Sequence, residues 1–135
     1  MKRYFFFVLL SSVVIYANEY FVVSSKDIQP LTKKQLKAIF LKKLKYINGK
    51  KVIPVNLSAK NPMRDSFEKE VLSMHFSELK RYWTQQHYLG KRSPLSMQSQ
   101  ESVKRVLKKI DGSLSYVDRE HLSDDLYVLY RWRSR

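Results

Sequence analysis

The polar residues between positions 56 and 64 carry the side chains best suited to chemistry in this 135-residue chain. Asn61 is a favourable N-cap residue and Pro62 suits the first helical position, so the segment predicts the start of a helix. A helix N-terminus exposes backbone N–H groups and about half a positive charge, which together attract anions. Ser58 adds a hydroxyl donor and Lys60 adds a point charge.

Arg64 completes this group, because its planar guanidinium can hold two oxygens of a tetrahedral anion. The residues predicted to form an oxyanion site are therefore Ser58, Lys60, Asn61, Met63 and Arg64. The same segment also fits a purely structural interpretation, in which Asn61 only caps its helix and Arg64 faces solvent or pairs with Glu68 at i+4. Both interpretations stay open at this level.

Catalytic and metal chemistry are disfavoured by the residue inventory. The chain has no Cys, so thiol nucleophiles, disulfides, iron–sulfur clusters and thiolate zinc sites are excluded. The three histidines, His75, His87 and His121, are far apart in sequence. The acidic residues near His121 are typical of a solvated turn and lack the pattern of a calcium loop. We expect no enzyme activity, no cofactor and no metal.

The N-terminal segment has the layout of a secretory signal peptide. Lys2 and Arg3 precede an apolar run over 4–16, and Ala17 offers a small residue for cleavage before a polar pair. We predict a signal peptide over 1–17, one domain over 18–135, and a soluble product in the periplasm. An uncleaved anchor is the alternative, but a spanning helix needs roughly 20 apolar residues.

Charge indicates an anionic partner. The chain has 26 Lys and Arg against 12 Asp and Glu, and without Lys2 and Arg3 the remaining 24 basic residues leave a formal charge of +12. Nucleic acid would suit such a balance in the cytoplasm, but export argues against it, so no nucleic-acid partner is expected. The remaining partners are phosphate or another oxyanion, an anionic membrane surface and acidic envelope polymers. A basic surface that is merely solvated is also compatible.

Hydrophobic periodicity predicts a mixed α/β domain. Strands are expected over 20–24, 51–56, 113–117 and 126–132. A helix is expected from Lys33 to about Lys42, with Thr32 and Gln35 forming a capping box. Three more helices are marked by apolar stripes, whose members are Met63, Phe67, Val71 and Met74; Leu79, Tyr82, Trp83 and Gln86; and Val103, Val106, Leu107 and Ile110.

Several local features refine these elements. Asn48-Gly49 predicts a turn, and Pro54 must direct its nitrogen towards an edge or a bulge because it cannot donate to a sheet. The aromatic residues Tyr82, Trp83 and Tyr88 are expected to pack on the sheet. Alternation over 126–132 predicts that Leu126, Val128, Tyr130 and Trp132 share one face. The region over 90–99 is expected to be a mobile loop.

Several segments together resemble the periplasmic phosphate-binding protein family of ABC transporters, and more closely its short single-domain, type 2 periplasmic-binding-protein-like relatives. They are Leu31–Phe40 (LTKKQLKAIF), Val52–Val55 (VIPV), the polar loop leading to Arg64 and Phe67, Tyr82-Trp83, and Asp111–Val117 (DGSLSYV). The resemblance implies a small mixed sheet flanked by about four helices, similar to one lobe of a type 2 periplasmic binding protein. It also implies a phosphate ligand held by loop hydroxyls, helix N-termini and an arginine, with an ABC permease or an envelope sensor as partner.

The chain departs from that family in informative ways. Ala59-Lys60-Asn61-Pro62 stands where long members have a Ser-Gly-Thr loop, so only Ser58 and Arg64 match the family's binding residues. The domain over 18–135 has room for one lobe, whereas a two-lobe clamp needs about twice that length. We therefore expect a half-enclosed oxyanion site. The alternative function is an envelope interaction module whose basic surface, including Arg131, Arg133 and Arg135, docks on anionic lipid or an acidic protein.

Overall fold

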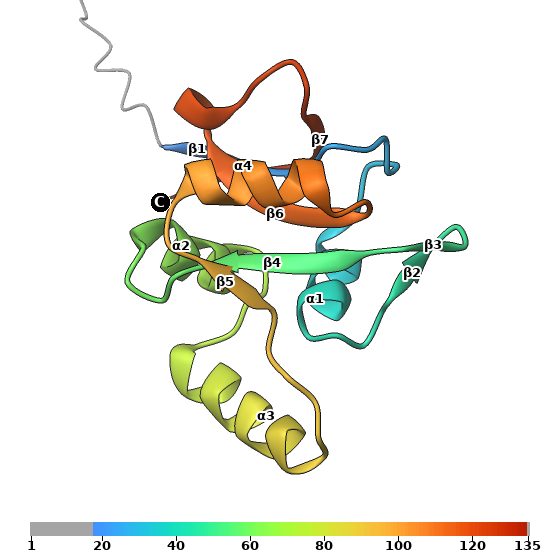
Figure 1. Cartoon of the computed structure of the whole chain (residues 1–135). Coiled ribbons are helices and arrows are strands. Elements are labelled where there is room, and N and C mark those ends of the chain that lie inside the picture. The colour runs from blue at the N-terminus through green and yellow to red at the C-terminus, as the bar shows by residue number, and fades with distance from the viewer. Residues whose placement is uncertain (1–17, 135) are drawn as a thin grey trace, which may run out of the picture.

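A computed structural model describes residues 18–134 (Figure 1). The predicted signal peptide over 1–17 and Arg135 lie outside the described residues. The elements in chain order are β1 (Glu19–Ser24), α1 (Lys33–Phe40), β2 (Tyr46–Ile47), β3 (Lys50–Lys51), β4 (Ile53–Leu57), α2 (Pro62–Glu70), α3 (Phe76–Tyr88), β5 (Leu95–Met97), α4 (Gln100–Lys109), β6 (Ser113–Asp118), a 3-10 turn (Arg119–His121) and β7 (Tyr127–Arg133).

Five strands form one mixed sheet in the order β5-β4-β6-β1-β7. Strand β4 is parallel to both β5 and β6, whereas β1 is antiparallel to both β6 and β7. The crossover from β4 to β5 contains α2 and α3, and the crossover from β5 to β6 returns through α4 in the opposite direction. Right-handed crossovers in opposite directions place α2 and α4 on opposite faces of the sheet (Figure 1). The predicted mixed α/β fold with about four helices is confirmed.

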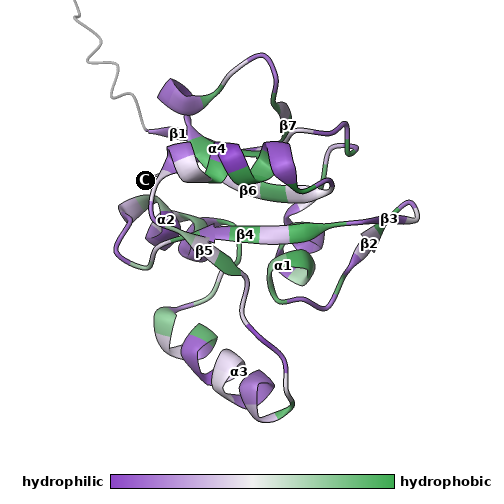
Figure 2. Ribbon diagram, viewed as in Figure 1, coloured by the Kyte–Doolittle hydropathy of each residue, from purple (hydrophilic) through white to green (hydrophobic). Residues whose placement is uncertain are grey.

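Aromatic side chains form the core on the face that α1 and α2 cover. The Phe67 and Tyr116 rings stack with centroids 4.3 Å apart, and Phe40 meets Phe67 edge-on at 4.6 Å. Trp132 from β7 closes the cluster and donates from Nε1 to Ser66. The opposite face packs against the apolar stripe of α4, whose Val103 and Leu107 are buried, while most other positions of the helix are hydrophilic (Figure 2). These cores fix β4 and α2 relative to each other.

The predicted start of the first helix is confirmed, because the Thr32 hydroxyl accepts from Gln35 N while the Gln35 side chain accepts from Thr32 N. The helix ends at Phe40, before the expected Lys42. The prediction of one strand over 51–56 is wrong at its start. Lys51 belongs to a separate two-stranded hairpin, β2–β3, whose turn at Asn48-Gly49 has positive φ at both residues, and β4 begins only at Ile53.

Pro54 lies inside the sheet without breaking it. Ile53 N donates to Gly112 O on the β6 side, so the nitrogen of Pro54 faces the β5 side. Pairing with β5 begins only at Val55, one residue later. The proline therefore sits where no partner strand requires a donor, as the sequence predicts.

The prediction of strict alternation over 126–132 is wrong. Val22 pairs with Tyr130 but Val23 pairs with Val128, so Leu129 is an extra residue in β7. This bulge places Val128 and Tyr130 on opposite faces and turns Leu129 into the core. Arg131 remains exposed, as expected, and lies over the Phe21 ring.

Helix α3 corrects the prediction made for its apolar stripe. It stands away from the sheet (Figure 1), and Leu79 is its only buried residue. Phe76 and Tyr88 on this helix are 69% and 85% exposed. The region over 90–99 also differs from the expected loop, because Leu95–Met97 forms the edge strand β5 beside β4. The returning chain thus brings residues 93–96 against α2 and α3.

Candidate functional site

A cavity of about 320 Å³ lies beside the carboxyl end of β4, between α2, α3 and the segment that leads into β5. Its apolar wall comes from residues such as Phe40, Leu72 and Leu79. Its polar lining consists of Asn56, Arg64, Glu68, Lys80, Ser93 and Ser96. A mostly apolar hollow with a few convergent polar groups is the usual form of a small-ligand site.

Asn56 presents a fixed hydrogen-bond donor to this cavity. The Tyr116 hydroxyl accepts a hydrogen bond from Leu57 N at 3.3 Å and donates its own hydrogen bond to Asn56 Oδ1. This chain of bonds sets the orientation of the amide, so the opposite atom is Nδ2, a donor. Asn56 is only 6% exposed, and its Nδ2 has no hydrogen-bond partner in residues 18–134. Burial also raises the pKa of Tyr116, which keeps its hydroxyl protonated.

Arg64 holds its guanidinium at the same cavity. Its Nη1 donates to Leu57 O at 2.9 Å, and its Nε lies 3.5 Å from Glu68 Oε2. Nε makes no hydrogen bond although it is buried, and Nη2 has no partner among the described residues. The guanidinium is therefore anchored through one nitrogen and keeps donors for a further acceptor.

Glu68 lies beside Arg64 and adds a carboxylate to the lining of the cavity. Partial burial raises the pKa of Glu68, and the adjacent Arg64 charge offsets only part of this effect. Lys80 contributes a second cation to the lining from α3. The cavity thus combines two cations, one carboxylate, the Asn56 amide and the hydroxyls of Ser93 and Ser96, an arrangement that suits an anion carrying its own proton.

The structure separates the residues predicted for the oxyanion site. Of the five, only Arg64 lines the cavity, and it also makes the pairing with Glu68 that the structural interpretation anticipated. Asn61 caps α2 by accepting from Met63 N at 2.9 Å, and the Met63 side chain is buried in the core. Ser58 Oγ accepts from Lys60 N at 3.4 Å, and Lys60 is exposed. Anion binding by this loop stays a prediction.

Several solved structures are similar to the described chain. The first is an ABC-type phosphate transport receptor from Vibrio cholerae, with a TM-score of 0.64, 14% identity, and coverage of 83% of this chain and 45% of that one. The second is a putative phosphate ABC transporter substrate-binding protein with bound phosphate from Clostridium perfringens, with a TM-score of 0.66, 14% identity, and coverage of 83% and 44%. The third is PstS from Borrelia burgdorferi, with a TM-score of 0.62, 12% identity, and coverage of 83% and 46%.

This chain has the fold of one lobe of these proteins. It spans less than half the length of each. No protein-family model and no curated protein matches the sequence. The first two structures are named as a phosphate transport receptor and a phosphate transporter substrate-binding protein. The expectation that this chain is not an enzyme stays a prediction.

Sequence reasoning missed most of the lining of this lobe's cavity. Asn56 is a polar residue within an otherwise apolar strand, and this was the one feature of the sequence that could have indicated its role. Lys80 and Ser96 gave no signal, because they reach the cavity only through the placement of α3 and the pairing of β5 with β4. Trp83, expected to pack on the sheet, instead lines the cavity from α3.

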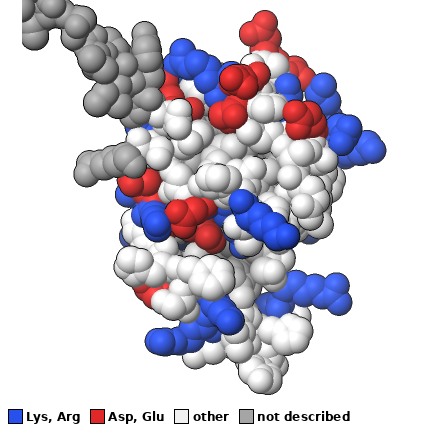
Figure 3. All heavy atoms as spheres, turned by 90° about the vertical axis from the view of Figure 1, so that its left-hand side faces the viewer, with Lys and Arg blue, Asp and Glu red and all other residues white. Residues whose placement is uncertain are grey.

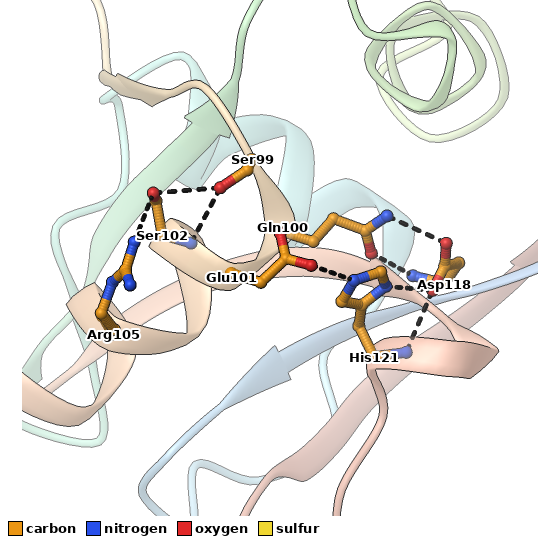
Figure 4. Close-up of polar contacts among 7 residues, drawn as sticks. All are labelled: Ser99, Gln100, Glu101, Ser102, Arg105, Asp118 and His121. Carbon is orange, nitrogen blue, oxygen red and sulfur yellow. Dashed lines mark hydrogen bonds and ion pairs between the residues drawn. The ribbon is translucent and has the colours of Figure 1, made fainter.

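A second polar cluster links the start of α4 to the end of β6 (Figure 4). Asp118 accepts from Gln100 Nε2 at 2.9 Å, and Asp118 N donates to Gln100 Oε1. The His121 ring lies between two carboxylates, with Nδ1 2.7 Å from Asp118 Oδ1 and Nε2 2.9 Å from Glu101 Oε1. The expectation that the acidic residues here form only a solvated turn is wrong for Asp118. Since both ring nitrogens are engaged, the cluster acts as a clamp between elements.

This clamp predicts a pH dependence of stability. The hydrogen bond that the His121 ring donates to Asp118, followed by the one that it donates to Glu101, raises the pKa of His121. A raised pKa in the folded state stabilises the protein below the unfolded pKa of about 6.5, and this stabilisation is lost as pH rises through the folded value. We expect wild type to lose about 0.5 kcal/mol more than His121→Gln between about pH 6 and about pH 9, measured by urea unfolding. Parallel pH profiles would contradict the assignment.

No group of three or more His, Cys, Asp or Glu residues in the described part of the chain is placed to hold a metal ion. None of the helices within residues 18–134 is long and apolar enough to cross a membrane.

Proposed function

We propose that this chain is an exported, periplasmic binding-protein-like domain that recognises a small oxyanion, phosphate, on behalf of an ABC transporter or an envelope sensor. The observation that carries the proposal is the convergence of Asn56 Nδ2 and the Arg64 guanidinium on one cavity at the carboxyl end of β4. Ligands of open α/β sheets bind outside the carboxyl ends of the strands. The likeness to phosphate transport receptors supports the choice of ligand class.

Glu68 supplies a physical reason for choosing phosphate over sulfate. Monohydrogen phosphate carries a proton that a carboxylate can accept, whereas sulfate carries none near neutral pH and would place its charge against Glu68. Arg64 and Lys80 would neutralise the remaining negative charge. The two cations thus attract the anion, and Glu68 favours an anion that carries a proton.

This chain spans less than half the length of the similar structures, and this affects how strongly it can bind a ligand. A single lobe covers one side of a ligand, so the anion would keep part of its hydration. We therefore expect weak binding by the isolated chain, and stronger binding where a second chain covers the cavity.

Calorimetric titration with phosphate, sulfate and nitrate tests the proposal. Saturable heat with phosphate and little with the other two anions is the expected result. No heat with any anion, at concentrations where the chain stays folded, would overturn the proposal. The proposal that a permease or a sensor recognises the anion-bound chain would then have no support either.

Glu68→Gln tests the source of selectivity. The amide can donate to any oxyanion, so we expect the variant to bind sulfate better and the phosphate-to-sulfate preference to fall about tenfold. In wild type the preference should also decline as pH falls through the raised pKa of Glu68, because a protonated carboxyl becomes a donor. Glu70→Gln, on the same helix but outside the cavity lining, is the matched control. An unchanged preference in Glu68→Gln would refute the role given to this carboxylate.

A further inference from the structure

A second hollow, of about 380 Å³, lies at the opposite end of β4 from Asn56. Its floor is apolar and is built from Ile39, Leu44, Val52, Ile53 and Pro54. Its charged lining is entirely basic and consists of Lys42, Lys45, Lys51, Lys91 and Arg92. We call this feature the basic hollow.

The cations of the basic hollow lack acidic partners. None of the five forms an ion pair within residues 18–134, and no carboxylate lines the hollow. This contrasts with the face shown in Figure 3, where basic and acidic side chains are interspersed. Burial, and then the charge of Lys45, lowers the pKa of Lys42, which is the expected effect of crowding like charges over an apolar floor.

The backbone holds Lys42 in this position at a cost. Lys42 has φ 58, in the left-handed region that favours glycine. It occupies the C′ position of α1, where Lys42 N donates to Ile39 O and Lys43 N donates to Ala38 O, the pattern of a Schellman motif. Glycine is the usual residue at C′, because it has no Cβ. This chain instead has a lysine there, and the lysine lines the hollow.

We propose that the basic hollow docks the protein on a membrane surface containing anionic phospholipid, with a lipid phosphate among the lysines and the adjoining acyl or glycerol carbons over the apolar floor. Charge complementarity selects the headgroup, because the lining offers five cations and no acid. Tyr46, which is 58% exposed, pairs with Lys51 in the adjacent hairpin β2–β3. An exposed tyrosine beside lysines suits the interfacial layer of a membrane. The basic hollow shares no lining residue with the cavity at Arg64.

Lys42→Gly provides a test that does not depend on a risk of unfolding. Glycine accepts the φ of this position, so the variant should keep or slightly raise its unfolding temperature while losing one cation. With vesicles of mixed phosphatidylglycerol and phosphatidylcholine, we expect binding to weaken about fivefold in Lys42→Gly and to weaken further in Lys42→Gly with Lys45→Gln. Vesicles of phosphatidylcholine alone should not bind.

Two controls make the result specific. Lys109→Gln removes the same charge from an exposed position on α4 that does not line the hollow, and should change vesicle binding much less. Arg64→Met should leave vesicle binding intact even if it abolishes phosphate binding. Soluble glycerol phosphate should compete poorly with vesicles. Equal losses in Lys42→Gly and Lys109→Gln, full competition by glycerol phosphate, or tighter binding to poly-glutamate than to vesicles would each overturn the proposal.

Discussion

Replacing Arg64 with methionine is expected to weaken phosphate binding about a hundredfold, because the variant loses a forked, charged donor from a partly desolvated cavity. Arg64→Lys should recover only part of the affinity, since an ammonium keeps the charge but not the paired donors. Calorimetric titration of both variants with phosphate measures the two losses. Arg64 is thus predicted to contribute through geometry as well as charge.

Stability must be followed in the same variants, because Arg64 also bonds Leu57 O and faces Glu68. Arg64→Met combined with Glu68→Met removes the unpaired carboxylate and should remain unable to bind phosphate while regaining stability. Arg81→Met on α3 is the charge-matched control and should bind phosphate like wild type. Phosphate affinity that stays within a few-fold of wild type in folded Arg64→Met would contradict the proposed site.

Gly112→Ala is expected to destabilise the fold by about 3 kcal/mol. Gly112 has φ +80, and a Cβ at this position would lie 2.1 Å from the backbone oxygen of Lys51. The clash involves main chain on both sides, because Gly112 O also accepts from Ile53 N at the start of the pairing between β4 and β6. Neither partner can move without disturbing the central strands. Urea unfolding measures the loss.

Gly90→Ala is the matched comparison, since Gly90 has φ +78 but a Cβ added at this position would have no atom within 4 Å. It should cost only about 1 kcal/mol, the price of the left-handed backbone alone. The difference between the two variants isolates the contact with Lys51. Equal losses in Gly112→Ala and Gly90→Ala would show that the close approach of the two segments carries no energy.

Local signals were sufficient where a few neighbouring residues decide the structure. Thr32 and Gln35 formed their predicted capping box, and Asn61 capped α2 as its sequence position indicates. The hydrophobic stripes of α2 and α4 also identified buried residues such as Phe67 and Leu107. In each case the determining interactions lie within one or two turns of chain.

The errors arose where distant segments decide the outcome. The bulge at Leu129 depends on the pairing of β7 with β1, and the exposure of Phe76 depends on α3 standing away from the sheet. The cavity has the same origin, since Asn56, Lys80 and Ser96 come from three elements that meet only in the folded chain. Of the residues that line the cavity, only Arg64 was predicted as an anion-binding residue, because its position in the first turn of α2 follows from neighbouring residues in the sequence.

The most direct test of the account is an NMR titration of the folded chain with phosphate, following the side-chain amide of Asn56 and the Nε–H of Arg64. We predict that both signals shift together and saturate, and that sulfate at the same concentrations moves them much less. Shifts confined to the backbone amides over 58–64, or an unchanged Asn56 amide at saturating phosphate, would contradict the assignment of the anion to this cavity.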